Sequence, residues 1–69
     1  MNPIDIHVNG ASIQTQSPHL QALLLERGHD LNGAFACAIN NTFVPRVQWH
    51  QRPLQAGDRV DVIAPITGG

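Results

Sequence analysis

The sequence predicts a small α+β domain in which a mixed sheet of four to five strands packs on one main helix. Several short stretches alternate apolar and polar residues with a period of two, which is typical of strands buried on one face. One stretch places leucines at helical spacing. Because a single helix and a one-sided sheet each need a cover for their apolar surface, we expect the two to pack together.

The first strand is predicted over residues 4–8, where Ile-Asp-Ile-His-Val alternates strictly. Asn9 and Gly10 follow, a pair that tolerates the positive φ angles of a tight hairpin turn. The chain is then expected to return as a second, shorter strand over residues 11–14. A β-hairpin therefore precedes the helix.

The main helix is predicted to begin at Ser17, which would act as the N-cap, with Pro18 at the first helical position. Gly28 is expected to end it, because glycine accepts the left-handed conformation that commonly follows the last helical turn. Three leucines between these signals fall on one helical face and form the apolar stripe: Leu20, Leu23 and Leu24.

A third strand is predicted in the stretch "AFACAIN", where large and small side chains alternate. Phe35, Cys37 and Ile39 would face the core, and Ala36 and Ala38 the opposite side of the sheet.

The rest of the chain completes the sheet. Asn40 and Asn41 predict a turn. Residues 43–44 are predicted to form a brief strand, which Pro45 confines to an edge of the sheet. Residues 47–55 are expected to form an irregular crossover. After a turn at residues 56–58, the alternation over residues 59–64 predicts the last strand, with Val60 and Val62 toward the core. The intervening residues would then face the opposite side, which places Asp61 and Ile63 there.

Two hairpins that flank a helix, closed by a last strand beside the first, define the β-grasp or ubiquitin-like arrangement. In this fold the last strand is central, so the C-terminal residues leave from the middle of the sheet. We therefore expect a single domain over residues 1–69, in which residues 66–69 form a flexible tail that carries Gly68 and Gly69.

The composition argues against several classes of partner. The net charge is -1, only 13% of residues are charged, and the four cations are all arginines. Nucleic-acid binding needs clustered Lys and Arg, so we expect no nucleic-acid partner. No continuous apolar run of membrane-spanning length and no signal-peptide pattern is found, and the chain has one cysteine. These features predict a cytoplasmic protein without a membrane partner.

No set of side chains in the sequence predicts catalysis or a metal site. Cys37 belongs to the inward-facing set and is expected to be a core residue. The four histidines lack the spacing of metal ligands, so we expect no metal. Asp58 follows Gly57 in a turn, where aspartate commonly accepts hydrogen bonds from nearby backbone. The sequence thus indicates a protein that is not an enzyme.

The two terminal glycines predict chemistry at the carboxylate of Gly69. An enzyme that converts this carboxylate to an acyl adenylate must thread the tail through a narrow slot, and glycine has no Cβ to clash there. Residues 65–69 can extend over about 17 Å, which is enough to reach the active site of a partner that binds the globular part. Gly68, Thr67 and Ile66 would lie in the slot.

Two segments, "AINNTFVPRVQW" and "LQAGDRVDVIAPITGG", closely resemble the ThiS family of sulfur carriers in thiamine biosynthesis. The resemblance covers nearly the whole chain in length and element order. Its most specific parts are Asn40, the Val44-Pro45-Arg46 tripeptide, Trp49, the turn at residues 57–58 and the terminal glycine pair.

The resemblance implies a cycle in which partner enzymes act on Gly69. An E1-like adenylyltransferase (ThiF-type) would adenylate its carboxylate with ATP. Sulfur from a cysteine desulfurase persulfide would then give a thiocarboxylate, which a thiazole synthase (ThiG-type) would use to build the thiazole ring. The carrier itself would bind no cofactor.

Two alternatives remain open on the sequence. The small subunit of molybdopterin synthase shares the fold and terminus, although its tail often has Pro-Pro where this chain has Ala64 and Pro65. A ubiquitin-like interaction module would not use its glycines chemically. For a carrier, the sequence predicts a flat partner-binding patch on the outward side of the sheet, in which Ala36 and Ala38 surround Ile63 as the only large anchor.

Overall fold

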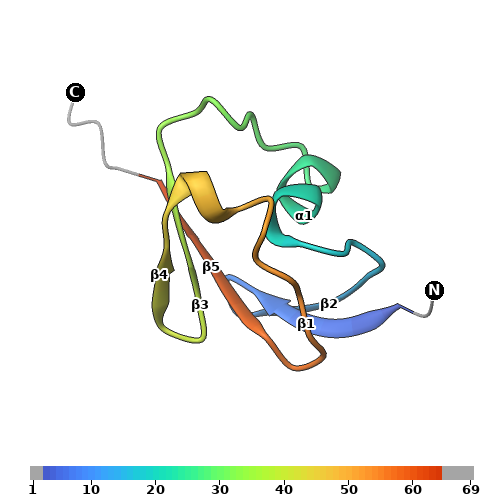
Figure 1. Cartoon of the computed structure of the whole chain (residues 1–69). Helices are drawn as coiled ribbons and strands as arrows, with labels where there is room; N and C mark the ends of the chain where they lie inside the picture. Colours follow the sequence, from blue (N-terminus) through green and yellow to red (C-terminus); the bar gives the residue numbers. More distant parts are fainter. Residues whose placement is uncertain (1–2, 65–69) are drawn as a thin grey trace.

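The computed structural model describes residues 3–64, which contain five strands in one sheet, one α-helix and one 3-10 helix (Figure 1). In chain order the elements are β1 (Ile4–Val8), β2 (Ala11–Thr15), α1 (Leu20–Glu26), β3 (Ala36–Ile39), β4 (Thr42–Val44), η1 (Arg46–Gln48) and β5 (Arg59–Ile63). Every predicted strand is present. The tail predicted over residues 66–69 lies outside the described residues.

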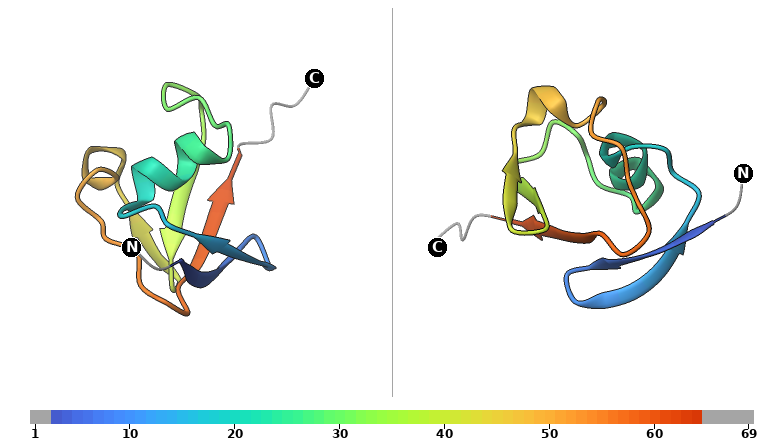
Figure 2. Two further views of the ribbon diagram at one scale, coloured as in Figure 1. Left: turned by 90° about the vertical axis from the view of Figure 1, so that its right-hand side faces the viewer. Right: turned by 60° about the horizontal axis from the view of Figure 1, so that its bottom comes forward.

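The sheet has the strand order β2-β1-β5-β3-β4 (Figure 2). β1 and β5 run parallel, with His7 opposite Arg59 and Val8 opposite Val60. The other neighbouring pairs are antiparallel. The last strand of the chain is therefore the central one, as the sequence predicts, and it joins the hairpin β1–β2 to the hairpin β3–β4.

Both predicted hairpin turns are confirmed by their backbone angles. Asn9 and Gly10 have φ angles of 51° and 85°, and Asn40 and Asn41 have φ angles of 53° and 67°. Positive φ at both central positions is the requirement of the tight turns that match the twist of paired strands. Asparagine and glycine are the residues that meet it at low cost.

The N-terminal end of α1 differs from the prediction: the N-cap is His19, and the helix begins at Leu20. His19 is extended because it lies against the crossover, where it forms a β-bridge with Pro53 and the amide of Leu54 donates to the Pro18 carbonyl. The His19 Nδ1 atom accepts the Ala22 amide at 3.1 Å.

Ser17, the predicted cap, instead binds the other end of the helix. Its hydroxyl donates to a carboxylate oxygen of Glu26 at 2.8 Å, and the buried Thr15 hydroxyl donates to the same carboxylate. The C-terminal end of the helix agrees with the prediction: Gly28 has a φ angle of 84° and its amide donates to Leu25. The next amide, of His29, donates to Leu24, which completes a Schellman motif.

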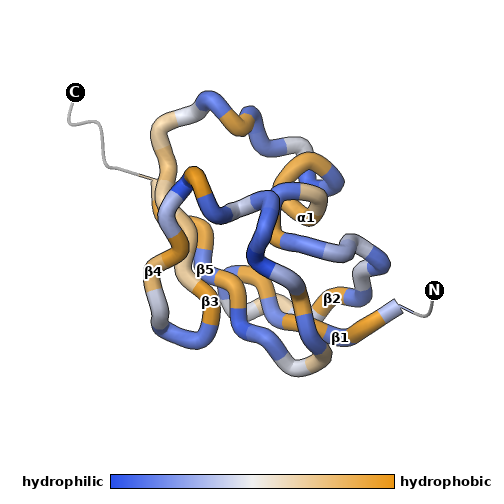
Figure 3. Tube along the Cα trace, in the orientation of Figure 1, coloured by the Kyte–Doolittle hydropathy of each residue, from blue (hydrophilic) through white to orange (hydrophobic). Residues whose placement is uncertain are grey.

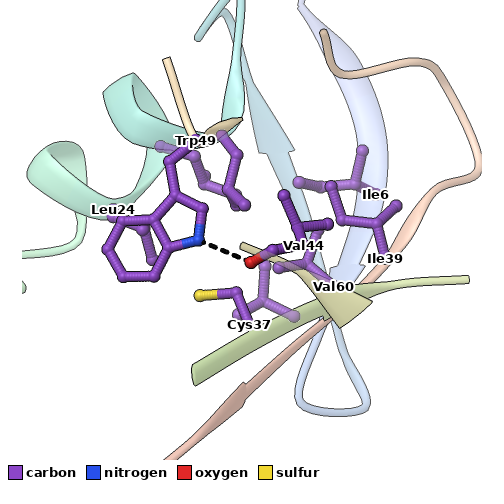
Figure 4. Packing of buried hydrophobic residues seen from close by; sticks show 10 residues of the cluster. Ile6, Leu24, Cys37, Ile39, Val44, Trp49 and Val60 are labelled. Carbon is purple, nitrogen blue, oxygen red and sulfur yellow. Dashed lines mark hydrogen bonds between the residues drawn. The ribbon is translucent and has the colours of Figure 1, made fainter. Parts of the chain in front are cut away.

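The core lies between α1 and one face of the sheet (Figures 3 and 4). The crossover contributes to it, since it opens with the 3-10 helix η1 rather than being irregular throughout, and Trp49 directly after η1 is 3% exposed. The indole N–H of Trp49 donates to the Val44 carbonyl at 3.0 Å. The buried apolar residues are Ile6, Val8, Leu20, Leu23, Leu24, Cys37, Ile39, Val44, Trp49 and Val60.

Candidate functional site at the end of β5

The two faces of β5 are oriented as the sequence predicts. Val60 is fully buried, and the half-buried Val62 packs against the core cluster. Ile63, the last residue of the strand, is 57% exposed. It pairs with Ala36 at the beginning of β3, so an exposed isoleucine stands where the chain leaves the sheet toward residues 64–69.

Ile63 is not the only large apolar side chain on this face, and that part of the prediction is wrong. Phe43 of β4 is opposite Ala38, which in turn is opposite Asp61, so these side chains share the open face of the sheet. Phe43 is 64% exposed. Ala36 and Ala38 lie between the two large residues and are half-buried.

We name the four apolar residues Ala36, Ala38, Phe43 and Ile63 the open-face patch. The sequence pattern assigns residues 43–44 only to an edge strand, so it does not predict that Phe43 belongs to this patch. The two-residue turn at Asn40 and Asn41 fixes the register, and with it the pairing of Ala38 with Phe43. The sequence therefore did contain the signal for this residue.

Polar side chains fix the opposite end of β5. The buried Asp58 accepts a hydrogen bond from the Asn40 side chain at 3.1 Å and one from the Gln55 amide at 2.9 Å. The Asn40 side-chain oxygen accepts the Arg59 amide at 2.9 Å. The guanidinium of Arg52 lies 4.0 Å from the Asp58 carboxylate. Asn40 and Asp58 thus tie the β3–β4 turn to the start of β5.

Cys37 lies on the covered face of the sheet and is fully buried, as predicted. Burial raises the pKa of its thiol from 9.0 to about 11, although the nearby positive charge of Arg46 acts in the opposite direction. At neutral pH the side chain is therefore a protonated thiol, which is a poor nucleophile.

Neither a metal site nor a membrane-spanning helix is found among the described residues. Within residues 3–64, no three His, Cys, Asp or Glu side chains come close enough to hold a metal ion. In the same residues, no helix is long and apolar enough to cross a membrane. The remaining predicted site residues, Ile66, Thr67, Gly68 and Gly69, lie outside the described residues.

The strand order, the single covering helix and the central last strand define a ubiquitin-like β-grasp domain. Its fold agrees with the crystal structure of the thiamine biosynthesis protein ThiS from Geobacter metallireducens, with a TM-score of 0.81. That match has 17% sequence identity and covers 96% of this chain and 100% of the other.

Sequence comparisons give the family. A model of the ThiS family matches residues 6–69. The sulfur carrier protein ThiS of Escherichia coli (strain K12) is 33% identical over 66 residues, which are 96% of this chain and 100% of that protein. The chain belongs to the ThiS family.

Proposed function

We propose that this protein is a sulfur carrier that holds sulfur as a thiocarboxylate on Gly69 and delivers it to the thiazole ring of thiamine. The observation that carries the proposal is the position of β5, which lies between β1 and β3 and ends at Ile63 of the open-face patch. Residues 64–69 thus continue from a firmly held strand next to a surface that a partner can cover. The family match, which extends through Gly69, supports the same function.

The chemistry belongs to partner enzymes, for which the carrier is a co-substrate. A carboxylate oxygen of Gly69 attacks the α-phosphorus of ATP, and pyrophosphate leaves as the acyl adenylate forms. The terminal sulfur of a cysteine persulfide, supplied by a desulfurase, then attacks the acyl carbon and displaces AMP. A second thiol reduces the resulting acyl disulfide, which leaves a thiocarboxylate on Gly69 and a disulfide on the donor side.

The partners are an adenylyltransferase of the ThiF type, which uses ATP, and a thiazole synthase of the ThiG type. Each would bind the open-face patch and admit the tail. Gly68, Thr67 and Ile66 would lie in the slot, where the absence of a side chain on Gly68 lets the backbone approach the reacting groups closely. Ile63 and Phe43 would be the anchors of the docked surface, because large apolar side chains that become fully desolvated dominate binding energy.

Intact mass spectrometry tests the proposal. The protein is incubated with ATP, a sulfide source and the adenylyltransferase encoded in the same genome. We expect the mass to rise by the difference between one sulfur and one oxygen atom, with the change located at Gly69 by fragmentation. An unchanged mass, with an adenylyltransferase that is active on its usual carrier, would contradict the sulfur-carrier function.

Genetic complementation tests the pathway. In a strain that lacks its own thiamine sulfur carrier, expression of this chain should restore growth without added thiamine. Restoration of molybdopterin synthesis instead, with no effect on the thiamine requirement, would favour the small subunit of molybdopterin synthase.

A further inference from the structure

Arg46 of η1 hydrogen-bonds to the backbone of the segment that connects α1 to β3. Its guanidinium donates hydrogen bonds to the carbonyl oxygens of Leu31, Gly33 and Phe35, the last two at 2.6 and 3.3 Å. One planar group therefore binds three backbone carbonyls within five consecutive residues, and the Gly33 carbonyl accepts the Phe35 amide as well. Arginine suits this task because its N–H donors have a fixed fork geometry.

The guanidinium is itself fixed on two aromatic rings. Its central carbon lies 4.6 Å from the centroid of the Trp49 ring and 5.5 Å from that of Phe35. The two rings stack on each other with centroids 5.1 Å apart. Because Trp49 is buried and hydrogen-bonded to Val44, the clamp formed by Arg46, Phe35 and Trp49 is anchored in the core.

The clamped segment is also tightly packed at Gly33. A Cβ atom at this position would lie 2.9 Å from the Asp30 carbonyl oxygen and 3.3 Å from the Phe35 ring. The Asp30 side chain accepts the Asn32 amide at 2.9 Å, which closes the same turn. The path of the chain into β3 is therefore determined by close contacts.

This path bears directly on the end of β5. Phe35, the last residue of the clamped segment, precedes Ala36, and Ala36 is opposite Ile63. On the other side of β5, the pairing with β1 involves only Arg59 and Val60. Beyond this ladder, the Val62 amide donates to the Asn9 side chain at 2.8 Å, so in the described part of the chain it is Ile63, the last residue of β5, that is paired only with β3, next to the residue that the clamp holds.

We infer that Arg46 is a positioning residue for the reaction at Gly69. By fixing the start of β3, it fixes the end of β5 and the direction in which the following residues leave the sheet. The inference rests on the proposed function, since that reaction is its readout. Loss of the clamp should leave Phe43 in place but displace Ile63 and Ala36, which weakens docking moderately and reduces the fraction of docked complexes in which the carboxylate reaches the nucleotide.

Steady-state adenylation separates these effects. Arg46→Ala, Arg46→Lys and the control Arg27→Ala are compared with the unaltered chain, at a temperature where melting curves show each protein to be folded. Arg27→Ala is the matched control because this substitution also removes one exposed arginine, four residues before Leu31 in the sequence. For Arg46→Ala we expect kcat to fall by about tenfold or more, as misplacement of a reacting group can cause, with a smaller rise in KM because Ile63 of the open-face patch is also displaced.

The variant Arg46→Lys separates the effect of the guanidinium's fork geometry from the effect of its positive charge. Lysine keeps the positive charge but cannot bind three carbonyls at once, so its kcat should lie nearer to that of Arg46→Ala. If Arg46→Ala does not fold, Arg46→Lys carries the test. Full activity of Arg46→Lys would overturn the inference. An unchanged kcat in folded Arg46→Ala, with or without a rise in its KM, would overturn it as well.

Hydrogen exchange provides a readout that needs no enzyme. Backbone amides of β3 and of the end of β5 should exchange about tenfold faster or more in Arg46→Ala, while those of β1 and β2 keep their protection. Equal protection of all strands would overturn the inference even if the unaltered chain is never adenylated. Absence of adenylation with the expected change in exchange would instead count against the proposed function only.

Discussion

The two faces of the sheet differ in what their side chains do. On the covered face, Ile6, Ile39 and Val60 are at most 1% exposed and form the core with α1. On the open face, Phe43 and Ile63 are 64% and 57% exposed. A chain of 69 residues has room for only one core, so one face of the sheet is used for stability and the other stays open to solvent. Substitutions on the two faces should therefore have separable effects.

The largest expected effect comes from neither face but from the C-terminal residue. Deletion of Gly69 should abolish sulfur loading completely, because the carboxylate would move back by one residue from the reacting groups. The melting temperature should remain unchanged, since the core is made by residues that end at Val62. Intact mass and a melting curve check the two halves of this prediction, and loading at the normal rate would contradict it.

The next effect tests the open face. Ile63→Asp should weaken binding to the adenylyltransferase by at least about tenfold, because a desolvated aliphatic anchor can contribute about 2 kcal/mol or more. The melting temperature should stay close to that of the unaltered chain. A binding titration beside a melting curve measures both, and thiazole synthase binding should weaken as well.

Val47→Asp is the matched control for Ile63→Asp. Val47 is 76% exposed but lies on η1, outside the open-face patch, so its replacement should leave affinity unchanged. Phe43→Asp should weaken binding in the same way as Ile63→Asp. Equal affinities for all three variants would mean that the partner does not cover the open face.

On the covered face, the expected effect is on stability. Cys37→Ala should lower the free energy of unfolding by about 1–3 kcal/mol at neutral pH, because it removes a fully buried side chain. Sulfur loading of the folded variant should be unchanged. Denaturant unfolding followed by a loading assay checks this, and loss of loading in a well-folded variant would contradict it.

Cys37 also gives the protein a distinct response to alkaline pH. Its thiol pKa is about 11 in the fold, above the ordinary value of 9.0. The unfolded chain therefore loses this proton first, so the stability is full below pH 9 and falls as the pH rises toward about 11, by roughly 2–3 kcal/mol. Since the chain has no lysine or tyrosine, Cys37→Ala should remove most of this decline.

The smallest expected effect concerns the helix that covers the sheet. His19→Ala removes the acceptor for the Ala22 amide and should cost about 1 kcal/mol of stability. His19→Asn keeps an acceptor at the cap and should be close to the unaltered chain. Unfolding in denaturant measures both, and equal stability of all three proteins would show that the cap contributes little.

Much of the fold could be predicted because its signals are local. Alternation located the strands, and asparagine and glycine located the turns, since positive φ restricts which residues can stand there. The burial of Cys37 and the exposure of Ile63 followed from the two-residue period alone.

The errors came from contacts between segments far apart in the chain. His19 rather than Ser17 caps the helix because the crossover holds His19 extended, and no local pattern reveals this contact. The clamp made by Arg46 likewise depends on a segment more than ten residues earlier. Such contacts depend on how distant segments pack together, and the alternation of apolar and polar residues within one segment does not predict that packing.

The strand order has a consequence for the sequence of events in folding. The hairpins β1–β2 and β3–β4 do not pair with each other, and β5, the last strand to leave the ribosome, stands between them. Every ladder hydrogen bond that joins either hairpin to the rest of the sheet therefore waits for residues 59–63, and pairing of β1 with β5 closes a loop of some fifty residues. The sheet and the open-face patch are thus completed together, late in folding, by the strand that continues into residues 64–69.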